Sequence, residues 1–192
     1  MPRGNRQLSD FGIYHIVVKS PSNLTLFKNS IDKINYLRII RFYQKIFHFK
    51  IYSYCIMDNH AHFTIDVGKE NLSNIMKKIK EKYSFYFRNS YNFSGSIFNN
   101  RFYSSIINSD TYLIQVTNYI HLNPASINSF KNKPEEYPFS SLGIYIKERK
   151  DYMNLIDCSR VLQYFSKDLK TATYIYKQNI LAPPNKRRFK IE

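Results

Sequence analysis

The sequence predicts an α+β fold of the ferredoxin-like or RRM-like kind, an antiparallel sheet covered by helices, with a helical appendage at the C-terminal end. Short β-branched and aromatic segments alternate with longer segments of helical periodicity, in the order β-α-β-β-α-β-α. The chain has 192 residues, of which 43% are hydrophobic, enough for one sizeable core. This order is typical of an α+β sandwich that leaves one sheet face free for a ligand.

The first third of the chain predicts a strand, a helix and a hairpin. Residues 11–19 are β-branched and aromatic, as expected of a strand. Residues 31–47 carry apolar side chains near helical spacing, which predicts a helix. Residues 49–57 read as a second strand, the dipeptide Asp58-Asn59 is typical of a turn, and residues 60–67 read as the returning strand.

Residues 70–88 give the clearest helical pattern, with apolar residues at i, i+3, i+4 and i+7. The opposite face of this helix holds Lys77, Lys78, Lys80 and Lys82. A polar segment follows over residues 89–100, and residues 101–108 read as a fourth strand. The lysine face is either simply solvated or placed along a phosphate backbone.

The last third is predicted to be helical with an irregular connection. Ser109 or Asp110 can cap a helix that runs to about Asn123. Residues 124–142 contain three prolines and predict irregular structure. A second helical region begins near residue 151.

We expect two parts, a main domain over residues 1–148 and a helical appendage with a basic tail over residues 149–192. The tail is Lys186-Arg187-Arg188-Phe189-Lys190. The apolar runs are too short to span a bilayer, and the first residues lack the apolar segment of a signal peptide. The expected location is therefore the cytoplasm, with no membrane partner.

Charge is the strongest compositional signal. The chain has 29 Lys and Arg against 14 Asp and Glu, a formal net charge of +15. It also has 17 Tyr and 15 Phe. Cationic surface interleaved with aromatic rings favours single-stranded nucleic acid, whose exposed bases stack on rings. The two cysteines, Cys55 and Cys158, belong to no Cys-x-x-Cys pair and read as buried thiols.

His60 and His62 open the returning strand of the predicted hairpin. Because side chains on a strand alternate with period two, both imidazoles point to the same face while Ala61 points to the other. Two imidazoles side by side are half of a metal site. Taken alone, a His-x-His pair is more often structural than metal-binding.

Tyr112, Tyr119 and Asn123 share one stripe of the predicted helix, at spacings of seven and four. A phenol one turn from an amide oxygen could supply a nucleophile and a third metal ligand together. Tyr119 would then attack a phosphodiester that the metal polarises, with Tyr112 as the rival nucleophile. The alternative is that this stripe is simply the edge of the core.

The segment Met57-Asp58-Asn59-His60-Ala61-His62-Phe63 resembles the Met-Pro-Asn-His-hydrophobic-His signature of the single-tyrosine HUH transposase family (IS200-like). Further segments match its REP-associated tyrosine transposase branch in the same order: Tyr14-His15-Ile16-Val17, Gly95-Ser96-Ile97-Phe98, Arg101-Phe102, Tyr119-Ile120-His121-Leu122-Asn123-Pro124 and Tyr137-Pro138-Phe139-Ser140-Ser141. The resemblance covers about residues 10–145.

The resemblance implies an endonuclease and transposase that cleaves single-stranded, often hairpin-bearing DNA and needs a divalent metal ion. By motif, His60 and His62 bind the metal, which is Mg²⁺ or Mn²⁺, and Asn123 is the third ligand. Tyr119 forms a 5′-phosphotyrosine link and leaves a free 3′-OH, which can reverse the reaction without external energy. The wider class works as dimers, whereas members of the REP-associated branch can act as monomers, so the resemblance leaves both a homodimer and a monomer open.

Two departures from the family pattern leave other functions open. Asp58 stands where the signature has Pro, which we expect to alter only the turn, and Ala125-Ser126-Ile127 replaces the usual Val-Arg-Ala. If the missing arginine contacts DNA, the chain could be an inactive or domesticated single-stranded nucleic-acid-binding protein of the same fold. A metallohydrolase acting on another substrate is disfavoured by the charge. His15 and His121 are expected to pack or to contact DNA.

Overall fold

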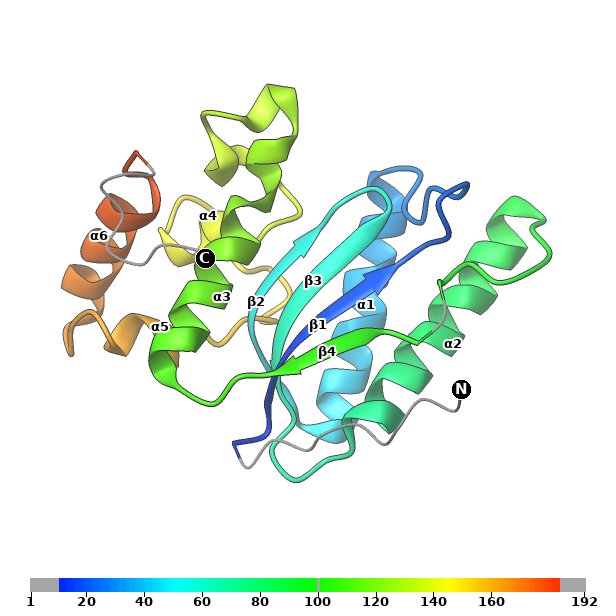
Figure 1. The fold of residues 1–192 in the computed structure, drawn as a ribbon, viewed down its shortest axis with the longest axis horizontal. Coiled ribbons are helices and arrows are strands. Elements are labelled where there is room, and N and C mark those ends of the chain that lie inside the picture. The colour runs from blue at the N-terminus through cyan, green and yellow to red at the C-terminus, as the bar shows by residue number, and fades with distance from the viewer. Residues whose placement is uncertain (1–10, 100, 184–192) are drawn as a thin grey trace.

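The computed structural model describes residues 11–99 and 101–183. Within these residues, four strands form one sheet in the order β2-β3-β1-β4, and every neighbouring pair is antiparallel (Figure 1). The strands are β1 (Ile13–Lys19), β2 (Lys50–Ile56), β3 (His60–Asp66) and β4 (Tyr103–Ile106). This is the ferredoxin-like arrangement, so the predicted fold class is confirmed. The predicted basic tail at 186–190 lies outside the described residues.

The first three helices begin within two residues of the predicted starts, whereas the helical region expected from residue 151 begins at Ser159 and a one-turn helix at Leu142–Tyr145 ends the segment predicted to be irregular. They are α1 (Ser30–Phe47), α2 (Leu72–Tyr91), α3 (Asp110–Leu122), α4 (Leu142–Tyr145), α5 (Ser159–Gln163) and α6 (Leu169–Ile180). Asn29, Asn71 and Ser109 cap the first three, each accepting a hydrogen bond from a backbone N–H of the first turn. The connection after α3 contains short 3₁₀ helices at Asn123–Ser126, Asn128–Phe130 and Pro134–Glu136. None of the described helices has the length and apolar character to cross a membrane.

The larger core lies between one sheet face and helices α1 and α2 (Figure 1). Side chains at alternate strand positions, such as Ile16, Ala61 and Phe63, point into this layer and are almost fully buried. Tyr36 of α1 and Tyr83 of α2 meet there with their ring centroids 4.9 Å apart. The polar alternate positions of the same strands must therefore point to the opposite face.

A second core lies on that opposite face, over β2 and β3, where α3 packs against the sheet. Helices α5 and α6 pack on the outside of α3 (Figure 1). Tyr176 and Ile180 of α6 share this core with Ile13 of β1 and Tyr52 of β2. The domain boundary near residue 148 stays a prediction, but the second core is continuous across it.

His121 of α3 lies at the centre of the second core and is fully buried. Its Nδ1 atom is 2.7 Å from the Tyr176 hydroxyl, and its Nε2 atom is 2.7 Å from the Ser141 hydroxyl. Burial lowers the pKa of His121 to about 3, so the ring is neutral near pH 7. His121 therefore packs inside the protein, as expected, and fixes the rotation of α3 against the sheet.

Acid should weaken the contribution of His121 to folding. The unfolded chain takes up a proton near the ordinary histidine pKa of about 6.5, whereas the folded chain takes it up only near 3. Stability is therefore full above about pH 6.5 and falls by about 1.4 kcal/mol per pH unit below it. We expect the difference in the free energy of unfolding between the wild type and His121→Gln to shrink by about 1 kcal/mol between pH 6.5 and 5.5 in urea titrations. A difference independent of pH would contradict this.

Candidate active site

The two histidines of the His-x-His pair lie at the start of β3, on the sheet face opposite α1 and α2. In the β1–β3 register His62 lies opposite Val17, and His60 lies opposite Lys19. The two imidazole centroids are 5.0 Å apart and their planes are nearly perpendicular. His62 is buried and His60 is half-buried. The prediction that both rings share one face is confirmed.

A third histidine joins them from the neighbouring strand. His15 of β1 lies opposite Thr64, two positions along from the pair formed by Val17 and His62. Its Nε2 atom is 3.1 Å from Nδ1 of His62, and the two rings are stacked. One ring donates this hydrogen bond and the other accepts it, so the contact fixes the orientation of His62. The sequence motif alone did not identify this role for His15.

Burial keeps these histidines neutral. It lowers the pKa of His15 to about 4 and that of His62 to about 3, where the two neighbouring histidines add to the effect. Burial also lowers the pKa of His60, and a hydrogen bond with the Asn123 side chain partly offsets this. Near pH 7 all three imidazoles are therefore neutral, and each keeps one unprotonated nitrogen that can accept a hydrogen bond or bind a metal.

Helix α3 brings Tyr119 to the histidines. The Tyr119 ring meets His62 edge-on at a centroid distance of 5.4 Å and meets His15 edge-on at 6.0 Å. Its side chain is 38% exposed, so water and other molecules can reach it. Tyr112, the other tyrosine of the predicted stripe, is 37% exposed but lies two turns earlier on α3. The described residues include no ring contact between Tyr112 and the histidines.

Asn123 lies one turn beyond Tyr119, at the end of α3. Its Nδ2 atom donates a hydrogen bond of 3.0 Å to the Tyr119 carbonyl, and its side chain also bonds to His60. The backbone of Asn123 is helical although Pro124 follows it, because Pro124 sits in the first turn of a 3₁₀ helix, where its ring is tolerated. The structure thus brings together His60, His62, Tyr119 and Asn123.

The chemistry of the cluster is set by neutral nitrogen and amide groups. Among the described residues, no three His, Cys, Asp or Glu side chains come together in a way that could hold a metal ion. The set on this face is instead three imidazoles and one carboxamide beside a phenol. Imidazole and amide ligands can hold a divalent cation when the substrate supplies further oxygens.

The turn before His60 is held by contacts from Lys33 of α1 and from Phe27. Lys33 of α1 is almost buried and donates to the Asp58 carboxylate at 2.7 Å and to the Tyr137 hydroxyl at 3.0 Å. Burial lowers the pKa of Lys33, but these two partners outweigh it and leave the pKa above its ordinary value. The Asp58 carbonyl accepts from the Phe27 N–H at 2.8 Å. Asp58 therefore ties the turn to α1, which the sequence did not indicate.

The described residues thus form a ferredoxin-like sheet that carries a histidine pair and is faced by a tyrosine on a helix. A family model described as "Transposase IS200 like" matches residues 11–123, more than half of the chain. The chain therefore belongs to the IS200-like transposase family.

Solved structures support the fold. One, described as "Structure of the REP associates tyrosine transposase bound to a REP hairpin", matches with a TM-score of 0.64 and 18% sequence identity. The match covers 77% of this chain and 86% of that chain. At this identity the likeness shows the fold alone. No curated protein matches the chain.

The contact between Lys33 and Asp58 can be measured in a double-mutant cycle. Asp58 is 75% exposed at its side chain, so water screens the pair. We expect Asp58→Asn to lower the free energy of unfolding by about 0.5–1 kcal/mol. The loss should disappear in a Lys33→Met background, because the ammonium partner is then absent. Urea unfolding of the wild type, the two single variants and the double variant gives the coupling free energy of the pair. If the two substitutions change the free energy of unfolding additively, the Lys33–Asp58 pair does not stabilise the fold.

Proposed function

We propose that the chain is a metal-dependent endonuclease and transposase that cleaves and rejoins single-stranded DNA through a 5′-phosphotyrosine at Tyr119. The observation that supports this best is the edge-on approach of the Tyr119 ring to His62 and His15. The family membership supports the same reaction class. Tyr119 is also the tyrosine of α3 that contacts the histidines within the described structure, whereas Tyr112 does not.

In the proposed cleavage, the Tyr119 phenol oxygen attacks phosphorus and forms a P–O bond. The bond from phosphorus to the 3′ oxygen breaks, and that oxygen leaves as a 3′-OH after taking up a proton. The phenol proton passes to water, which reaches the half-exposed Tyr119 side chain. One phosphodiester replaces another, so attack by a 3′-OH on the phosphotyrosine reverses the step without external energy.

The donor atoms near Tyr119 fit a divalent cation. Nδ1 of His62 is occupied by His15 and Nδ1 of His60 by Asn59, so Nε2 of each ring is the atom available to a cation. The Asn123 amide donates through Nδ2 to the Tyr119 carbonyl, and its bond with His60 would open when both side chains bind the cation. His60, His62 and Asn123 would therefore hold Mg²⁺ or Mn²⁺, and the imidazoles suit Mn²⁺ at least as well. When bound, the metal supplies Lewis-acid polarisation of the phosphodiester.

The proposed DNA partner is a single strand that carries a hairpin. The net charge of +15 favours a polyanion. The solved structure of similar fold is described as bound to a REP hairpin, which supports this type of ligand for the present chain. The alternative, a non-catalytic nucleic-acid-binding protein, would bind the same DNA and form no covalent product.

Tyr119→Phe should abolish covalent attachment to DNA. The wild type, incubated with labelled single-stranded hairpin DNA and Mg²⁺ or Mn²⁺, should give an adduct that resists denaturant, because the phosphotyrosine bond is covalent. Tyr112→Phe is the matched control, since Tyr112 is on the same helix and is equally exposed. We expect that variant to keep the adduct. Salt-sensitive binding with no adduct under any metal would favour the non-catalytic alternative.

His60→Ala should weaken metal binding without DNA present. Loss of one imidazole should lower Mn²⁺ affinity by about tenfold or more, measured by isothermal titration calorimetry. His48→Asn is the control, because it removes an exposed histidine at the end of α1. Asn also tolerates the left-handed backbone of that position, where φ is 54°. Equal Mn²⁺ affinity in His60→Ala and the wild type would contradict the proposed ligand set.

A further inference from the structure

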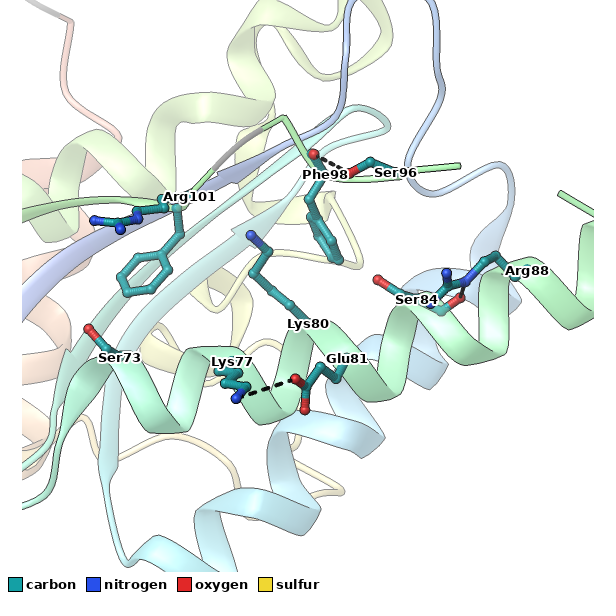
Figure 2. A pocket seen from close by; sticks show the side chains of 10 residues that line it. Ser73, Lys77, Lys80, Glu81, Ser84, Arg88, Ser96, Phe98 and Arg101 are labelled. Atoms are coloured by element: carbon teal, nitrogen blue, oxygen red, sulfur yellow. Dashed lines mark hydrogen bonds and ion pairs between the residues drawn. The ribbon is translucent and has the colours of Figure 1, made fainter. Parts of the chain in front are cut away.

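A basic groove lies on the helix side of the sheet, away from the histidines. It has a volume of about 720 Å³ and is formed by α2 together with Ser96, Phe98, Arg101 and Phe102 (Figure 2). We define the α2 groove by its lining residues, which are Ser73, Lys77, Lys80, Glu81, Ser84, Arg88, Ser96, Phe98, Arg101 and Phe102. None of these residues belongs to the candidate active site, so the groove needs its own explanation.

The lining of the α2 groove suits a polyanion. It contains four cationic side chains and one carboxylate, that of Glu81, which lies 3.9 Å from Lys77. The Ser84 hydroxyl adds a neutral donor that can bond a phosphate oxygen, whereas the Ser96 hydroxyl donates to the Phe98 carbonyl at 2.8 Å. In Figure 2 Lys80 extends from α2 toward Phe98, and its Nζ atom lies 4.9 Å from the centre of that ring. Phe98 itself is only 6% exposed, so it offers no open face for stacking a base. The four cations therefore favour a phosphate-bearing ligand.

The charges run along one face of α2. Lining residues of this helix occur at positions 73, 77, 80 or 81, 84 and 88, spacings of three and four that keep them on one side. At 1.5 Å per residue this face is about 22 Å long. A groove of that length could follow several phosphates of one DNA strand, since they are spaced about 3.4 Å apart along a duplex axis.

Strand β4 connects the groove to the active site. Ser105 of β4 pairs with His15, and β4 is the edge strand next to β1. Tyr103, which pairs with Val17 on the histidine face, is 62% exposed. Arg101 comes two residues before Tyr103 and lines the end of the groove nearer Ser73 (Figure 2). A strand that leaves the histidines and crosses the exposed part of β4 therefore meets Arg101 next.

We propose that the α2 groove binds the phosphodiester backbone of the DNA segment adjoining the phosphate that is cleaved. The inference rests on the proposed function, because it assigns a second contact to the same substrate. The backbone could belong to the duplex stem of a hairpin or to an unpaired flank, since both present the same phosphates. In either case the groove contributes affinity and positions the strand, while Tyr119 acts on it.

Two charge-matched pairs on α2 test the groove. The groove pair, Lys77→Gln/Arg88→Gln, removes two exposed cations that line the groove. The outside pair, Lys78→Gln/Lys82→Gln, removes two exposed cations of the same helix that do not line it. Both pairs carry the added Tyr119→Phe change, so that binding is measured without cleavage. The probes are an oligothymidine of about 10 nucleotides, one of about 40 nucleotides, and a hairpin of about 12 base pairs with an unpaired tail of about 10 nucleotides.

The salt dependence of binding gives the readout. For the hairpin or the long oligothymidine, we expect the groove pair to reduce the slope of log affinity against log salt by about 1.4–1.8, because each lost phosphate contact removes about 0.7–0.9. The outside pair should change it by less than half of that. If the groove pair reduces the slope only for the hairpin, the ligand of the groove is the duplex stem. If it also reduces the slope for the long oligothymidine, the ligand is unpaired backbone. The short oligothymidine should show little difference between the pairs.

Equal salt slopes in the groove pair and the outside pair would overturn the inference, because binding would then depend on total charge and not on the groove. That outcome is separate from failure of the proposed function. If the chain with Tyr119 intact forms a covalent adduct and the groove pair behaves like the outside pair, only the groove assignment is wrong. If no DNA gives an adduct that depends on Tyr119, the proposed function is wrong, and the assignment that rests on it falls with it.

Discussion

The antiparallel pairing of β1 with β3 is the constraint on which the candidate site depends. Because Val17 lies opposite His62, the period of two places His15 on the same face as the His-x-His pair. A shift of one residue would turn these imidazoles into the core under α1 and α2. Ala61 and Phe63 oppose such a shift, since they are almost fully buried in that core and would be turned out of it. The apolar side chains on one face of β3 therefore fix the position of the histidines on its other face.

A second constraint is the rotation of α3 about its own axis. Successive residues of a helix are about 100° apart, so residues two apart point in nearly opposite directions. His121 is held in the second core by Tyr176 and Ser141. Tyr119 must then point away from that core, toward the histidines on the sheet, and Asn123 follows on the same side one turn later. A buried histidine with no proposed chemical role thus sets the direction of the proposed nucleophile.

Periodicity was sufficient to predict the elements that have one apolar face. It gave the hairpin, the two sheet-covering helices, the shared face of His60 and His62, and the neighbouring positions of Tyr119 and Asn123. Contacts between distant segments could not be predicted in this way. The hydrogen bond between His15 and His62 joins residues 47 apart and depends on strand register, which one sequence does not specify. The α2 groove likewise depends on how the segment before β4 docks.

The turn at Asp58 shows how one departure from the family signature changes what holds the site. A proline there would fix the backbone angle φ locally and would need no partner. Asp58 instead accepts a hydrogen bond from Lys33 of α1, and its carbonyl accepts from the Phe27 N–H. The next residue, Asn59, contacts Nδ1 of His60 through its side-chain oxygen at 2.6 Å. In this chain the orientation of His60 therefore depends on the ion pair between Lys33 and Asp58, and so on how α1 packs against the sheet. With a proline at this position, the turn itself would set that orientation.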